Sequence, residues 1–230
     1  MKKHSKSYQE KQDKIEGLNK YSLVEAVELL KKIPAAKFNE TVEFTARLGI
    51  DTRHSDQQVR GTLIMPHGLG KKIKVVVVAK GEKLQEAEAA GADVVGSEDL
   101  IEKIKGGWVD FDVLLTTPDM MRLVGQLGKI LGKRGLMPSP KTGTITFELK
   151  KAIDDFRRGK VEFRADKYGI VHIPVGKIDF TNSKLQDNIR AIYDALLKMK
   201  PASAKGLYVK RISLASTMSP SIKLDAALMN

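Results

Sequence analysis

The apolar residues of this 230-residue chain follow one pattern near its two ends and another in its middle. Near the ends, apolar and polar residues alternate, as in segments 42–50 and 161–166. Alternation with a period of two predicts strands that bury one face and expose the other. In the middle, Ile73–Ala79 is a nearly continuous apolar run, which is typical of a parallel strand covered on both faces. The ends and the middle are therefore expected to form different folding units.

The charge of the chain is divided in the same way. In total, 40 Lys and Arg against 28 Asp and Glu give a net charge of +12 at pH 7. Residues 1–65 and 160–230 together hold 24 basic and 15 acidic residues, whereas 66–159 hold 16 and 13. The larger excess at the ends predicts a polyanionic partner there. Cysteine is absent, which excludes disulfides, thiolate metal sites and cysteine nucleophiles.

The end segments predict a small antiparallel sheet with helices on one face and a polar opposite face. Segment 161–175 reads as a hairpin around the turn residues Asp166–Gly169, and segment 207–218 as a last strand. Two amphipathic helices are expected, each beginning with a capping box. The residue pairs that fit the two capping boxes are Ser22 with Glu25 and Ser183 with Gln186.

The middle predicts a Rossmann-like layer, because strand and helix patterns alternate from residue 73 to about residue 135. The expected fold class is α/β with two domains: an α+β outer domain with an antiparallel sheet, built from 1–66 and 160–230, and an inserted Rossmann-like domain, 67–159, with a parallel sheet. The two connections are expected to form a hinge. The predicted hinge residues are Pro66, His67, Gly68, Gly159 and Lys160.

No motif for catalysis or cofactor binding is complete. The glycines at 68 and 70 lack the third glycine of a dinucleotide fingerprint, and segment 128–133 is one residue short of a phosphate-loop spacing. His4, His54, His67 and His172 are scattered without metal-ligand spacing. We therefore predict no catalytic residue, cofactor or metal. No segment approaches the length of a membrane span, and a cytoplasmic location is expected.

Two functional classes remain open from the residues alone. The first is an RNA-binding structural protein, favoured by the basic end segments and by a polar sheet face of mixed charge, on which Glu43, Glu162 and Asp166 are expected. The second is an RNA-modifying or nucleotide-dependent enzyme that uses the inner layer. The missing phosphate loop and acid/base set favour the first class.

Four segments carry distinctive motifs: 125–144, which is the longest, and 36–43, 59–70 and 216–218. Together these segments resemble the ribosomal protein L1 family of the large subunit, and segment 125–144 is similar to the family's signature. They lie in the order expected of the family and span nearly the whole chain. One departure is Ser219, because the family usually has glycine there. Glycine permits a positive φ that serine adopts only at a cost, so the contact around Ser219 is in question.

The resemblance implies binding to large-subunit ribosomal RNA, formation of the mobile stalk beside the tRNA exit site and release of deacylated tRNA from that site. It also implies repression of the protein's own operon mRNA, and a monomer when free, with no membrane partner. The family's RNA contacts, carried over by motif, lie on the outer domain. The predicted RNA-binding residues are Lys37, Phe38, Thr41, Glu43, Arg164, Asp166, Lys167, His172, Ser216, Thr217, Met218 and Ser219.

Overall fold

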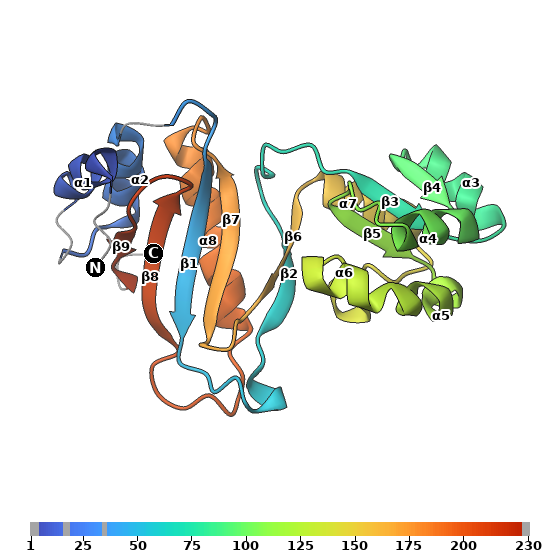
Figure 1. Cartoon of the computed structure of the whole chain (residues 1–230). Coiled ribbons are helices and arrows are strands. Elements are labelled where there is room, and N and C mark those ends of the chain that lie inside the picture. Colours follow the sequence, from blue (N-terminus) through green and yellow to red (C-terminus); the bar gives the residue numbers. More distant parts are fainter. Residues whose placement is uncertain (1–4, 16–18, 34–35, 227–230) are drawn as a thin grey trace. The chain divides into compact units, whose positions relative to one another are not determined.

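The chain forms two compact units, as the computed structural model shows (Figure 1), and residues 5–15, 19–33 and 36–226 are described. The outer unit comprises the described residues up to Gly70 and from Val161 onward, and the inner unit is Lys71–Lys160. The predicted fold class is confirmed, because the outer unit holds an antiparallel sheet and the inner unit a separate parallel sheet.

The outer sheet has the strand order β7-β1-β8-β9. The central strand β1 (Thr41–Leu48) pairs antiparallel on one side with β7 (Ile170–Lys177) and on the other with β8 (Val209–Ser216). The short β9 (Ile222–Leu224) pairs with β8. Alternate residues of β1 are fully buried, as the period-two pattern predicts.

Helices α2 (Leu23–Lys32) and α8 (Asn182–Lys198) cover one face of this sheet and build its core (Figure 1). A short α1 (Lys6–Asp13) precedes them. The capping box of Ser22 and Glu25 is confirmed. The second predicted box is wrong, because Thr181 is the N-cap of α8 and accepts a hydrogen bond from the Lys184 amide.

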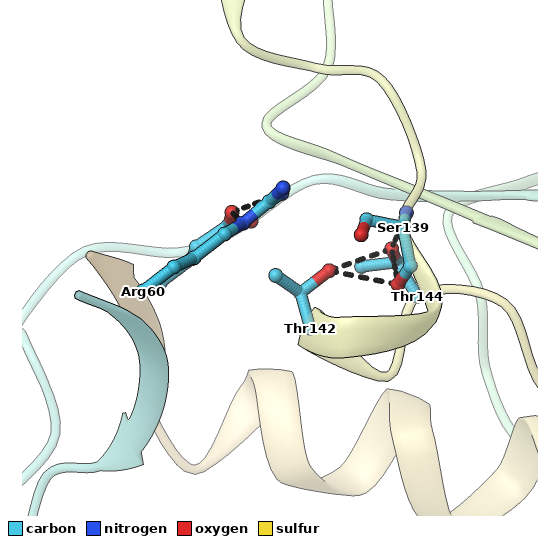
Figure 2. Close-up of polar contacts among 5 residues, drawn as sticks. Arg60, Ser139, Thr142 and Thr144 are labelled. Atoms are coloured by element: carbon cyan, nitrogen blue, oxygen red, sulfur yellow. Dashed lines mark hydrogen bonds and ion pairs between the residues drawn. The ribbon is translucent and has the colours of Figure 1, made fainter. Parts of the chain in front are cut away.

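The predicted hairpin over 161–175 is also wrong in its pairing. The strand β6 (Lys160–Arg164) pairs with β2 (Arg60–Ile64) in a separate two-stranded sheet, while β7 pairs with β1. Arg60, labelled in Figure 2, donates from Nε and Nη2 to one carboxylate oxygen of Glu162, at 2.8 and 2.6 Å. Glu162 is therefore neutralised on the small sheet, away from the polar face where it was expected.

The inner unit is a three-stranded parallel sheet in the order β4-β3-β5, with helices against both faces. Val75 and Val77 pack into one apolar cluster and Val76 and Val78 into the other, as expected for a strand buried on both faces. The strands are β3 (Val75–Val78), β4 (Val94–Gly96) and β5 (Val113–Thr116). The α-helices are α3 (Glu82–Ala89), α4 (Glu98–Lys105), α5 (Met121–Val124), α6 (Gly128–Arg134) and α7 (Leu149–Arg157). The inner unit also has short 3-10 turns, η2 (Pro118–Met120), η3 (Gly125–Leu127) and η4 (Pro140–Thr142), whereas η1 (Ser55–Gln57) belongs to the outer unit.

Four of the predicted hinge residues, His67, Gly68, Gly159 and Lys160, are held by contacts within their own units, and Pro66 is exposed. The amide of His67 donates to Oδ1 of Asn188 on α8, and Nδ2 of Asn188 donates to the Gly68 carbonyl, both at 3.1 Å. Gly159 is buried with φ of 98°, and Lys160 places its ammonium 3.7 Å from Asp155. The chain crosses between the units directly after Gly70 and again after Lys160. Movement at these two crossings stays a prediction.

Candidate RNA interface

A tight turn after β8 presents two of the predicted contact residues. In this turn, residues 216–219 and here called the Thr217 turn, the amide of Ser219 donates to the carbonyl of Ser216 at 3.1 Å. Thr217 and Met218 occupy the two central positions, and 55% of Met218 is exposed. The turn therefore holds a hydroxyl and a large apolar side chain at the surface.

The Thr217 turn is attached to the start of β1. The amide of Thr41 donates to Oγ1 of Thr217 at 3.1 Å, and Nζ of Lys177 donates to Oγ1 of Thr41 at 2.8 Å. Phe38 is 52% exposed and Lys37 is exposed in the segment leading to β1. Five predicted residues, Lys37, Phe38, Thr41, Thr217 and Met218, thus come from the start of β1 and the end of β8, which the β1–β8 register brings together.

Glu40 lies beneath this end of the sheet and is only 1% exposed. Its Oε2 accepts hydrogen bonds from the hydroxyl of Ser216 and, at 3.0 Å, from the amide of Met218, while Oε1 accepts from the amide of Ala36 at 2.6 Å. Glu40 therefore connects the segment before β1 with the Thr217 turn. It was within the family-like segment 36–43, but the sequence does not distinguish it from a surface acid.

The pKa of Glu40 reflects two opposing effects. Burial raises the pKa of this carboxyl, but the hydrogen bonds from Ser216, Ala36 and Met218 and the nearby charge of Lys11 outweigh burial, so the pKa lies below its ordinary value. The carboxylate is therefore ionised at neutral pH. An ionised buried carboxylate is tolerated because each oxygen accepts at least one hydrogen bond.

The sheet face opposite the helices, here called the open face, is polar and carries charges of both signs. Along β1 it presents Glu43, Thr45 and Arg47. Thr45 lies between His172 on β7 and Ser213 on β8, and its hydroxyl is 3.3 Å from Nδ1 of His172. The polar face predicted from alternation is thus present. Of the three acids expected there, Glu43 is the one that β1 exposes on it.

Three further predicted residues, Arg164, Asp166 and Lys167, lie away from the start of β1. The turn that holds Asp166 and Lys167 precedes β7, and β7 begins opposite Arg47, so about 20 Å of strand separates it from Thr41. The carboxylate of Asp166 accepts from the amides of Tyr168 and Ile170, both at 2.8 Å, and so shapes the turn. Arg164 lies exposed on β6, in the two-stranded sheet. The predicted residues therefore extend along the outer unit and do not form one cluster.

Ser216 and Ser219 act mainly within the protein. Ser216 is 9% exposed and its hydroxyl donates to Glu40. The Oγ of Ser219 accepts from the Ser216 amide at 2.8 Å. Among the described residues, positive φ values occur only at glycines, so Ser219 has no left-handed strain. Serine at this position is compatible with the turn and adds a hydrogen bond that glycine lacks.

The signature-like segment of the inner unit has a structural explanation. Thr144 Oγ1 accepts from the Ser139 amide at 2.7 Å, and the hydroxyls of Thr142 and Thr144 lie 3.0 Å apart beside the Ser139 carbonyl (Figure 2). Both threonines are buried. These bonds fix the loop over the end of β5, where Thr116 and Ile145 form a bridge. The hydroxyls of Thr142 and Thr144 therefore make hydrogen bonds that stabilise this loop.

Two further findings concern other classes of site. Within residues 5–15, 19–33 and 36–226, no three His, Asp or Glu side chains gather as metal ligands; His4 lies outside these ranges. None of the helices in the same ranges is long and apolar enough to span a membrane.

Comparison with known families agrees with the resemblance seen in the motifs. The model of the Ribosomal protein L1p/L10e family matches residues 29–220, which include β1, the Thr217 turn and the whole inner unit. Such a match over most of the chain shows common descent. The chain belongs to the ribosomal protein L1 family and is a large-subunit ribosomal protein that binds ribosomal RNA.

Proposed function

We propose that the protein binds large-subunit ribosomal RNA through the Thr217 turn, the adjoining Phe38 segment and the open face. The observation that carries this proposal is the exposure of Phe38, Thr217 and Met218 at one end of the sheet, where hydrogen bonds to Glu40 and Thr41 hold the Thr217 turn. Exposed apolar side chains beside a hydroxyl and a lysine suit a sugar edge and its phosphate.

The exposed side chains of this surface differ in the part of the RNA that each can contact. The Thr217 hydroxyl accepts from the Thr41 amide and donates to the Thr41 carbonyl, which leaves one lone pair to accept from a ribose 2′-hydroxyl. Phe38 and Met218 offer apolar surface for a base or sugar. Lys37, and Arg47 on the open face, offer positive charge for phosphates. Lys167 and Arg164 extend the basic surface toward the other end of the outer unit.

The same surface is proposed to take the protein's own operon mRNA, which would explain repression by competition between two similar RNA folds. We also propose that the bound protein forms part of the stalk at the tRNA exit site of cytoplasmic ribosomes and assists release of deacylated tRNA. In this proposal the protein works by binding and carries out no chemical reaction, which agrees with the incomplete catalytic motifs.

The test measures affinity for a large-subunit rRNA stalk fragment in the variants Phe38→Ala and Thr217→Val. Each is expected to weaken binding about tenfold, the equivalent of about 1.4 kcal/mol, because a stacking surface or a hydroxyl contact is lost. Phe147→Ala is the matched control, since Phe147 lies in the inner unit and is 51% exposed, as Phe38 is at 52%. The control is expected to bind normally.

The leader of the protein's own mRNA is then added as a competitor. It is expected to displace the rRNA fragment from the unmodified protein and to lose affinity in the same two variants. Wild-type affinity of both variants for the rRNA fragment would show that the interface lies elsewhere. Loss of rRNA affinity without loss of mRNA affinity would separate repression from this surface.

A further inference from the structure

The backbone at Met218 is held from both sides by buried charged groups. Its amide donates to Glu40 at 3.0 Å, and its carbonyl accepts from Nζ of Lys11 at 3.2 Å. Glu40 is 1% and Lys11 8% exposed. With both polar groups of the residue bound, the side chain of Met218 is the part that remains available at the surface.

Helix α1 contacts the Thr217 turn through a buried lysine, Lys11, where an apolar residue would be usual. In α1 it is the one buried residue among those whose burial is described, and the rest of this short helix is polar. Helices of soluble proteins normally bury apolar residues against the body of the fold. A lysine is seldom buried without a partner. Ile15, which follows the C-cap of α1, is buried in the outer core and anchors the end of the helix. The contact of Lys11 with the Met218 carbonyl links the helix itself to the Thr217 turn.

Glu40 is equally specific in its contacts. Its carboxylate receives donors from three places: the segment before β1, the last residue of β8 and the centre of the Thr217 turn. An amide side chain has only one acceptor oxygen. Glutamine at this position would place its NH₂ group against at least one of these donors.

We propose that Lys11 and Glu40 form a clamp that sets the Thr217 turn in its RNA-binding conformation before RNA arrives. The proposal rests on the proposed function, because it assigns positioning residues to the same interface. Ordering a loop costs free energy, and a loop that is already ordered in the free protein no longer subtracts that cost from binding. Neither clamp residue needs to contact RNA.

The test uses Glu40→Gln and Lys11→Met in the full-length protein, with affinity for the rRNA stalk fragment measured over a range of salt concentrations. Each variant is expected to bind about tenfold more weakly, as for one lost hydrogen bond to a charged group. The slope of affinity against salt is expected to stay unchanged, because neither residue contacts phosphate. Lys6→Met is the control for Lys11→Met, since Lys6 is exposed on the same helix.

A double-mutant cycle distinguishes positioning from general destabilisation. If the clamp acts by placing Met218, Glu40→Gln is expected to cost much less affinity in a Met218→Ala background than in the unmodified protein. Together with Phe147→Ala, a residue of the inner unit, its effect is expected to be unchanged. An equal loss in the Met218→Ala background would overturn the proposal.

The outcomes separate this proposal from the one on which it rests. Normal binding by Glu40→Gln and Lys11→Met, with weak binding by Phe38→Ala and Thr217→Val, would overturn the clamp and leave the interface in place. Normal binding by Phe38→Ala and Thr217→Val would reject the interface itself. If Glu40→Gln does not fold, Lys11→Met carries the decision, because it alters the clamp from α1 without unpairing the carboxylate from its three protein donors.

Discussion

Ser219 shows how one side chain compensates for a departure from a family pattern. The family resemblance predicts glycine at this position, yet Ser219 adopts a backbone that any residue tolerates, and its Oγ accepts a hydrogen bond from the Ser216 amide at 2.8 Å. The serine thus adds a bond across the Thr217 turn. The doubt raised by the sequence rested on an assumed positive φ, which local sequence does not reveal.

Replacing Ser219 by alanine is expected to lower the free energy of unfolding by about 1 kcal/mol, the usual contribution of one hydrogen bond. Glycine at this position is expected to cost slightly more, since it also gains freedom in the unfolded chain. Urea denaturation measures both values. A variant Ser219→Gly more stable than the unmodified protein would show that the hydroxyl does not stabilise the turn.

At the scale of elements, the strands that were predicted best are those with a strong local pattern. Alternation of apolar and polar residues predicted β1, and the continuous apolar run predicted β3, because burial on one or both faces of a strand determines the local order of apolar residues. The pairing partner of a strand is not determined by its local order of residues. The partner of β6 was therefore predicted wrongly, since β2 lies about a hundred residues earlier in the chain.

Helix α7 could have been predicted from periodicity, because its buried residues Leu149, Ala152, Ile153 and Phe156 follow helical spacing. The burial of Glu40 could not have been predicted from local sequence. Its burial depends on Ser216 and Met218, which lie more than 170 residues away in sequence. The exposed part of the candidate site, Phe38 with Thr217 and Met218, was found through the resemblance to a family, and composition alone indicated only a polyanionic partner.

The β1–β8 pair carries a prediction of its own. Arg47 and Arg211 lie directly opposite each other on the open face, and both are exposed. Like charges opposite each other destabilise a sheet, and a phosphate between them would relieve the repulsion. Arg211→Ala is therefore expected to leave the free protein equally or more stable, to weaken RNA binding and to reduce the salt slope by about 0.7–0.9 for one lost phosphate contact.

These quantities are measured by urea denaturation and by RNA titration at several salt concentrations. Lys103→Ala is the control, because Lys103 is an exposed cation on α4 of the inner unit. An unchanged salt slope in Arg211→Ala would mean that this arginine does not contact phosphate in the complex.

At the scale of the whole molecule, the two units have separate cores and separate sheets. All the predicted RNA-binding residues belong to the outer unit. The inner unit is inserted between β2 and β6, and the chain re-enters the outer unit after Lys160. RNA binding by the outer unit is thus expected not to require the inner sheet.

Replacing residues 71–159 by a short Gly/Ser linker is expected to leave a folded outer unit that keeps most of its affinity for the rRNA fragment. Circular dichroism and cooperative unfolding check the fold, and RNA titration checks binding. A folded variant that no longer binds would assign an essential contact to the inner unit. Separately, tight binding of a nucleotide by residues 71–160 would favour the enzyme hypothesis.

The position of β1 determines when the protein becomes competent during its own synthesis. Its two neighbours, β7 and β8, begin more than 120 residues later in the chain, at Ile170 and Val209. Because a chain leaves the ribosome from its N-terminus, the inner unit is complete before β1 has either partner. The proposed RNA surface is thus assembled only after β8 has been synthesised, and a chain terminated before Ile170 has a complete inner unit but lacks the partners of β1 in the outer sheet.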